Sequence, residues 1–194
     1  MNLPAAAIHA RWKAARLLLA GLTTALLLAQ PTACIAQEPG IHIRALIAGA
    51  RQVGAGRLTW FGFHAYDAAL FADNRRFADN APLALELTYA RPFKGSDIAE
   101  RSIGEIRKLG LVQEREAVEW LAILTNLFPD VRSGDRLTGV SPARGAAQFF
   151  HNGRPLGEID NDRLKHAFFA IWLDPRTSAP DLRNRLIGAP AAAK

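Results

Sequence analysis

The chain has 194 residues, with 24 Lys and Arg side chains against 18 Asp and Glu, and a formal net charge of +6. The basic residues are scattered rather than clustered, which argues against the positively charged surface of a nucleic-acid-binding protein. A single cysteine cannot form an intrachain disulfide, so a disulfide-stabilised scaffold is excluded as well.

The first part of the chain has the features of a secretory signal. Three basic residues within residues 11–16 precede an uncharged apolar run over residues 17–29, and small residues follow up to Ala36. As a helix, this run spans only about 20 Å, which is too short for a hydrocarbon core of about 30 Å. We therefore predict cleavage after Ala36, a periplasmic or secreted protein that begins at Gln37, and no stable membrane insertion afterwards.

Two alternatives concern the same segment. One is a retained membrane anchor, and the other is a lipid-modified Cys34 at the cut site. A lipoprotein signal usually has Leu three positions before the cysteine, where this sequence has Pro31. Cleavage after Ala36 removes three basic residues and no acidic ones, which leaves a net charge of +3, no cysteine and about 158 residues. That length suits one domain, predicted over residues 37–188, with residues 189–194 as a frayed tail.

Hydrophobic patterns predict several strands. The longest aromatic, β-favouring stretch covers residues 54–71 and contains no proline, as expected for the middle of a sheet, where every backbone N–H is paired. We predict one long central strand here, bent at Gly62. Shorter strands are predicted over residues 41–45, 83–89, 135–140, 146–150 and 155–159, the last two joined by a tight turn at Asn152–Gly153.

Helical periodicity appears in the middle and at the end of the chain. Two consecutive helices are predicted, one between Gly95 and Gly110 and one over residues 114–128, with Val118 in the apolar stripe of the second. Two more are predicted over residues 163–173, capped by Asp160, and residues 180–187, where Ser178 and Asp181 form a capping box. Consecutive helices between strands do not fit an alternating β-α-β chain, so the pattern predicts a single α+β domain.

Motifs for a cofactor or a metal are missing from the sequence. The glycines at positions 49, 54 and 56 lack the Lys-Ser/Thr of a phosphate-binding loop, and we interpret them as a plain turn. The histidines after position 36 do not have the spacing of metal ligands. We interpret Asp130 and Asp135 as turn residues between a helix and a strand rather than as an acid–base pair. We therefore expect neither a cofactor nor a metal.

The order of several motifs resembles a known family. A Gly-x-Gly strand leads to the sequence Tyr-Asp-Ala-Ala-Leu at residues 66–70. The later motifs occupy residues 85–91, 128–138, 149–153 and 168–174. Together they are similar to the bacterial, secreted branch of the chalcone isomerase-like family. The resemblance implies a large antiparallel sheet with helices packed on one face.

Function does not follow from fold, so the family's catalytic positions matter individually. In the plant enzymes, a strand Arg together with Thr, Tyr and Asn contacts the substrate or its ordered water. The resemblance puts Leu58 at the Arg position, Phe61 at the Thr position, Ile98 at the Tyr position and Glu105 at the Asn position. Apolar groups cannot stabilise the developing charge. The same Arg and Tyr hold the carboxylate in fatty-acid-binding members, so the replacements also argue against an anionic ligand.

The leading hypothesis is therefore a non-catalytic protein that binds a small apolar ligand, or a protein partner, between sheet and helices. Leu58, Phe61 and Ile98 are expected to line the pocket, with Glu105 at its rim, and to suit a neutral or cationic ligand. The alternative is an intramolecular isomerase or lyase on another substrate, in which Arg57, Tyr89 and Glu105 form the polar set. A structural subunit without a pocket is the third possibility.

Overall fold

The computed structural model of the chain describes residues 37–73, 76–78 and 81–188, which form one compact unit. The predicted signal segment and the predicted frayed tail lie outside the described residues. Within the described part, no helix is long and apolar enough to cross a membrane.

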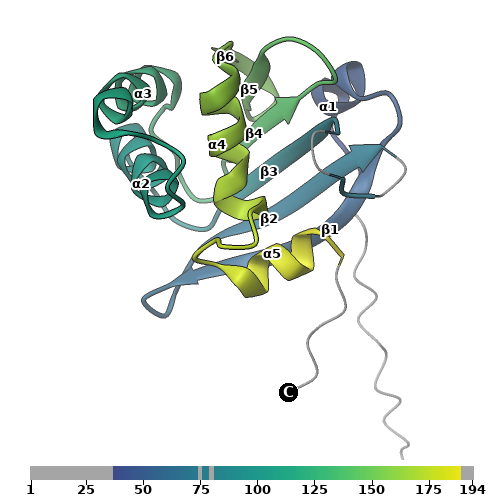
Figure 1. The fold of residues 1–194 in the computed structure, drawn as a ribbon. Helices are drawn as coiled ribbons and strands as arrows, with labels where there is room; N and C mark the ends of the chain where they lie inside the picture. The colour runs from purple at the N-terminus through teal and green to yellow at the C-terminus, as the bar shows by residue number, and fades with distance from the viewer. Residues whose placement is uncertain (1–36, 74–75, 79–80, 189–194) are drawn as a thin grey trace, which may run out of the picture. The chain divides into compact units, whose positions relative to one another are not determined.

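In the part of the chain that the structure describes, six antiparallel strands form one open sheet in which each strand pairs with its neighbours in the sequence (Figure 1). The order β1-β2-β3-β4-β5-β6 places β3 and β4 in the middle and β1 at one edge. Every second side chain of a strand faces the same side of the sheet, so each strand contributes to two different surfaces. The strands are β1 (Ala50–Trp60), β2 (Phe63–Asp73), β3 (Leu83–Tyr89), β4 (Arg136–Ser141), β5 (Ala147–His151) and β6 (Arg154–Ile159).

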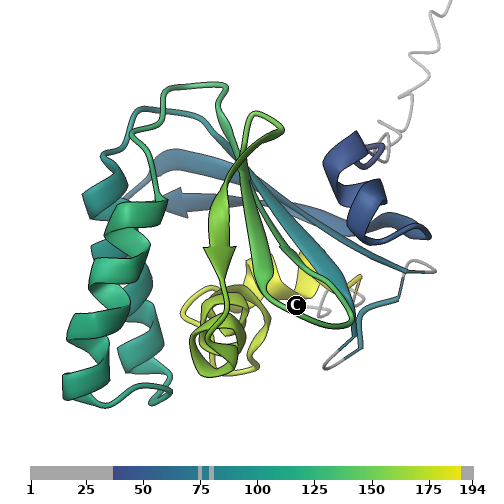
Figure 2. The same cartoon turned by 90° about the horizontal axis from the view of Figure 1, so that it is seen from above.

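Five helices of the described residues accompany the sheet, and together they give the predicted α+β, chalcone isomerase-like architecture. The main core lies between the sheet and the helices from α2 onwards, whereas α1 packs on the opposite face of the sheet (Figure 2). The helices are α1 (Ile41–Leu46), α2 (Gly95–Lys108), α3 (Glu114–Leu127), α4 (Asp162–Leu173) and α5 (Pro180–Leu186).

The predicted single strand over residues 54–71 is wrong, because the chain reverses within it. Phe61 and Gly62 have φ angles of 47° and 79°, the left-handed conformation of both central residues in a two-residue hairpin turn. The stretch therefore forms the β1–β2 hairpin, and β1 is an edge strand rather than a central one. Gly62 marks a turn, not a bend.

The predicted strand over residues 41–45 is also wrong. This segment is helix α1, in which Ile43 is buried, and the C-cap residue Ile47 that follows the helix is buried beside it. They pack against Phe71 and Val140 on the outer face of the sheet. Two alternating isoleucines fit a strand and a helix equally well over so short a segment.

The glycines in β1 allow a helix to approach the sheet closely. A Cβ atom added at Gly54 would lie 2.0 Å from the backbone oxygen of Arg185 in α5, and one at Gly56 would lie 2.8 Å from Leu182. Gly54 and Gly56 are therefore strand residues that make room for α5, and their interpretation as a plain turn is wrong.

Smaller corrections concern helix faces and caps. Val118 is 69% exposed, and Trp120 takes the buried position on α3 together with Leu124. Asn161, rather than Asp160, caps α4 by accepting a hydrogen bond from the Leu164 N–H at 2.9 Å. The local sequence identifies each helix, but the packing of the fold decides which of two neighbouring residues is buried or caps the helix.

Candidate ligand-binding cavity

A cavity of about 600 Å³ lies between the sheet and the helices on its main-core face, which is within the size range of small-molecule sites. Strand β3 contributes Leu85, Leu87 and Tyr89, the residues that alternate with Glu86 and Thr88 on the opposite face. Further apolar walls come from β1, β2, β4, β5, α2 and α4, and they include Leu58, Ala65, Ile98, Leu137, Phe149, Phe168 and Ile171.

Aromatic rings form one end of this cavity. Phe168 on α4 is in contact with Phe128, Phe149 and Trp172, with ring centroids 5.2–5.8 Å apart. Every residue from Ala167 to Leu173 on α4 is buried. The rings therefore pack on one another at this end of the cavity, at the centroid separations typical of aromatic pairs.

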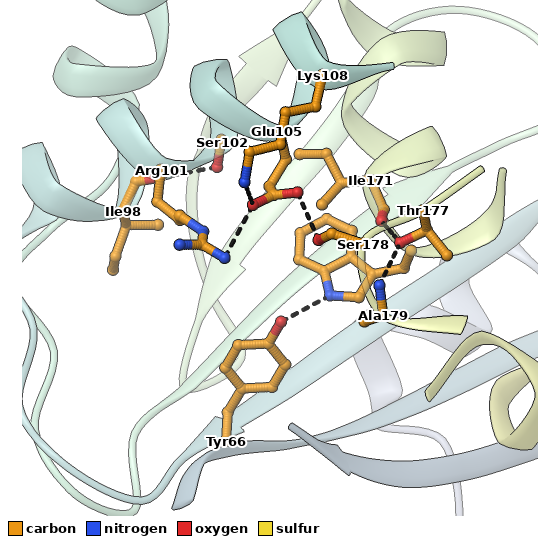
Figure 3. A network of polar contacts seen from close by, with 11 residues as sticks. Tyr66, Ile98, Arg101, Ser102, Glu105, Lys108, Ile171, Thr177, Ser178 and Ala179 are labelled. Atoms are coloured by element: carbon orange, nitrogen blue, oxygen red, sulfur yellow. Dashed lines mark hydrogen bonds and ion pairs between the residues drawn. The ribbon is translucent and has the colours of Figure 1, made fainter. Parts of the chain in front are cut away.

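Glu105 on α2 is the centre of a polar cluster at the wall of the cavity (Figure 3). Its Oε1 atom accepts a hydrogen bond from Lys108 Nζ at 3.0 Å and lies 2.8 Å from Arg101 Nη2. Its Oε2 atom accepts a hydrogen bond from the Ser178 hydroxyl at 2.6 Å. Burial alone would raise the pKa of Glu105, but the hydrogen bonds from Ser178 and Lys108 and the charge on Arg101 outweigh it, so the pKa lies below its ordinary value.

The loop between α4 and α5 holds Ser178 in place. Thr177 is buried, donates a hydrogen bond to the Ile171 carbonyl at 2.6 Å, and accepts one from the Ala179 N–H at 3.2 Å (Figure 3). Ser178 therefore does not cap α5 as predicted; its hydroxyl binds Glu105, and Ala179 takes the N-cap position.

Two tyrosines supply hydroxyl groups to the same cavity. Tyr66 accepts a hydrogen bond from Trp172 Nε1 at 2.9 Å, which leaves its own proton free to be donated (Figure 3). The Tyr89 hydroxyl forms no hydrogen bond with another described residue, and its ring lies 5.9 Å from that of Tyr66. Burial raises the pKa of Tyr66 to about 12 and the pKa of Tyr89 further, so both phenols are neutral donors at physiological pH.

The comparisons with known proteins agree with this architecture. The sequence model of the chalcone isomerase-like family matches residues 53–188. The chain belongs to the chalcone isomerase-like family. Among solved structures, a fatty-acid binding protein from Arabidopsis thaliana matches with a TM-score of 0.56 and 12% sequence identity, over 72% of this chain and 87% of that one. This similarity shows a shared fold. No curated protein matches the sequence, and assignment to the bacterial, secreted branch of the family stays a prediction.

Three of the four residues expected at the pocket of this chalcone isomerase-like protein lie at the cavity wall: Leu58, Ile98 and Glu105. Phe61 does not, because it occupies the turn of the β1–β2 hairpin, where its side chain is 83% exposed. The Thr position of the family was placed at Phe61 by counting five residues back from Tyr66 along a single strand. The chain reverses at Phe61 and Gly62, so this count does not stay on one strand. Glu105 is buried within its ion pairs rather than open at a rim.

The alternative polar set is not assembled in one place. Tyr89 and Glu105 line the cavity, whereas Arg57 lies at a separate, open hollow beside Glu86 and Thr88. Arg57 there donates a hydrogen bond to Asp67 Oδ1 at 2.9 Å. Adjacent residues of a strand face opposite sides, so the position next to Leu58 cannot reach the same cavity.

Sequence reasoning missed four residues of this site: Tyr66, Arg101, Trp172 and Ser178. Tyr66 carried a signal, because it lies in the aromatic stretch that organises the first hairpin and is part of the family motif. Arg101 is four positions before Glu105 on α2, the spacing of a helical ion pair. The contacts of Trp172 and Ser178 join residues far apart in the chain, and local patterns do not reveal such contacts.

Proposed function

We propose that this chalcone isomerase-like protein binds a small, neutral and largely apolar molecule in the cavity, without transforming it. The observation that carries the proposal is an apolar cavity whose wall presents two neutral phenol donors, Tyr66 and Tyr89. Each hydroxyl can donate its proton to a ligand oxygen, and the apolar wall around it suits an apolar ligand body. The expected ligand therefore carries a carbonyl-type oxygen on an apolar body.

The charges at the cavity wall favour a neutral ligand. Two basic residues, Arg91 and Arg101, and two acidic ones, Asp97 and Glu105, line the cavity, so the formal charges of its wall sum to zero. An ionised ligand would lose its hydration on entry without meeting an excess of opposite charge. The fatty-acid binding protein of similar fold supports an apolar ligand, while the replaced family positions, Leu58 and Ile98, argue against a bound carboxylate.

The absence of catalysis is part of the proposal. At the four positions where the plant enzymes carry Arg, Thr, Tyr and Asn, this chain has Leu58, Phe61, Ile98 and Glu105. Electrostatic stabilisation of developing charge is usually the largest catalytic contribution, and two of these positions put apolar side chains at the cavity wall. Incubation with a chalcone should therefore leave the cyclisation rate at its buffer value, and an acceleration would contradict the proposal.

Export to the periplasm or the medium is also proposed, on the basis of the signal-like residues 1–36. The mature protein should then begin at Gln37, which an intact-mass measurement of the exported protein tests directly. A mass that includes residues before Gln37, or a diacylated Cys34, would contradict this assignment.

Binding is tested by titrating ligand-free protein with molecules of matched chain length. We expect methyl decanoate to bind more tightly than decanoate, decylamine or an alkane of equal length. Tyr89→Phe should weaken the ester about three- to tenfold, because one neutral hydrogen bond is lost, and leave the alkane unchanged. We expect the variant to fold, because the Tyr89 hydroxyl forms no hydrogen bond with another described residue.

Three results would contradict the proposal in different ways. If none of the four molecules binds, the cavity is not a site for small apolar ligands. If decanoate binds best, the ligand is anionic. If Tyr89→Phe weakens the ester and the alkane equally, the hydroxyl does not recognise the oxygen.

A further inference from the structure

The turn between β1 and β2 exposes three aromatic side chains side by side. Trp60 is 46% exposed, Phe61 83% and Phe63 64%, and the rings of Trp60 and Phe61 are 5.1 Å apart. Figure 1 shows this hairpin projecting beyond α5 at the end of the sheet. Contiguous exposed apolar groups on a soluble domain usually mark an interaction surface. We call Trp60, Phe61 and Phe63 the hairpin tip.

The backbone at the hairpin tip makes the choice of Phe61 unusual. Phe61 and Gly62 have φ angles of 47° and 79°, and the turn between β5 and β6 repeats these values with Asn152 at 51° and Gly153 at 79°. Asn tolerates the left-handed conformation, whereas a bulky aromatic residue there is strained. The second hairpin thus shows which residue type this turn favours. The Phe61 side chain therefore stabilises neither the turn, whose backbone conformation it disfavours, nor the core, from which it points away.

Basic side chains lie directly behind the hairpin tip. The guanidinium carbon of Arg91 is 5.3 Å from the centroid of the Phe63 ring, and that of Arg101 is 4.8 Å from the Trp60 ring. Arg101 is also paired with Glu105, while Arg91 forms no ion pair with another described residue. Aromatic side chains with arginine beside them suit the interface between acyl chains and anionic headgroups.

The size of the hairpin tip favours a lipid surface over a protein partner. A stable protein–protein interface covers about 800 Å² on each partner, more than three side chains on one turn can supply. Binding at a lipid interface instead grows with the apolar area that is buried and with the attraction of basic groups to anionic lipids. We propose that the hairpin tip, with Arg91, docks peripherally on an anionic lipid surface.

Docking at the hairpin tip would place the cavity beside the lipid. Trp60, Phe63, Arg91 and Arg101 belong to the tip region and also line the cavity. The proposal does not depend on which ligand the cavity holds, because it rests on the exposed rings and the strained turn.

The test is co-sedimentation of ligand-free protein with vesicles of phosphatidylcholine alone or mixed with phosphatidylglycerol. Intact mass should first show that all variants begin at the same residue, so that the apolar N-terminal segment cannot cause a difference. The Phe61→Asn variant gives the β1–β2 turn the same Asn-Gly pair that forms the β5–β6 turn. It should reduce binding to mixed vesicles at least about tenfold and leave the thermal midpoint unchanged or higher. Val118→Asn, at an exposed site on α3, is the control and should bind as the original protein does.

The headgroup dependence tests the role of Arg91. Arg91→Gln should remove the preference for phosphatidylglycerol and lower the salt dependence of binding. The proposal is overturned if the original protein does not sediment with either vesicle. It is equally overturned if Phe61→Asn binds as well as the original protein does. Loss of ligand binding in the cavity with vesicle binding intact would contradict the proposed function alone.

Discussion

At the scale of single residues, Glu105 shows which contacts of the site can be predicted from the sequence and which cannot. Its place in the family motif identified it, and its neighbours Arg101 and Lys108 lie at helical spacing. The contact with Ser178 was not predictable, because it joins residues 73 positions apart. Leu58 and Ile98 were found by the same counting, whereas Phe61 was misplaced because a hairpin turn intervened.

Glu105 should make stability depend on pH in a defined direction. Its pKa is lowered in the folded protein, so its contribution is present above the ordinary carboxyl pKa of about 4.3 and is lost as the pH falls through the folded value. Glu105→Gln should lower the free energy of unfolding at pH 7 by about 1–2 kcal/mol. Urea denaturation should show this difference shrinking between pH 5 and pH 3.

The matched control is Glu114→Gln, which removes a carboxylate paired with Arg107 at 2.7 Å on the surface. An exposed pair contributes little to stability, so this variant should follow the original protein at every pH. If Glu105→Gln and Glu114→Gln behave alike, the buried cluster does not stabilise the fold in the way described.

At the scale of elements, the sequence identified most strands and all the helices after residue 90, because their periodicity is long and regular. Residues 83–89 form β3 as predicted, and the Asn152–Gly153 turn joins β5 to β6. The failures are at the first hairpin and α1. An Asn at position 61 would have predicted a turn, but the sequence has Phe61 there. Helix α1 is too short for a helical period to be distinguished from the alternation of a strand.

The glycines of β1 predict how α5 is held against the sheet. Gly54→Ala should lower the free energy of unfolding by about 2–3 kcal/mol, because the new Cβ would lie 2.0 Å from the Arg185 backbone oxygen. Gly104→Ala is the control, and it should raise the free energy of unfolding rather than lower it. Its Cβ meets nothing within 4 Å, and alanine in a helix stabilises by about 0.5–1 kcal/mol. Chemical denaturation of both variants decides the point; equal effects would contradict the close packing of α5.

At the scale of the whole molecule, the cavity depends on an arrangement that no local pattern contains. Strand β3 and helix α2 are consecutive in the chain, but helix α4 comes much later, and Tyr89, Ile98 and Phe168 nevertheless face the same space. The family resemblance anticipated the layers and the antiparallel sheet. It did not anticipate the hydroxyl group of Tyr66, because the family's polar residues occupy other positions, whereas Tyr89 was expected in the polar set of the alternative hypothesis.

The most direct test of the central claim is a comparison of ligand binding by Ile98→Trp and Val118→Trp. Both replace an aliphatic helix residue with tryptophan, but only Ile98 lines the cavity, and Val118 is exposed on α3. Titration with methyl decanoate should show at least a tenfold loss of affinity for Ile98→Trp and no change for Val118→Trp, with both proteins folded. Equal affinity in the two variants would contradict binding in the cavity.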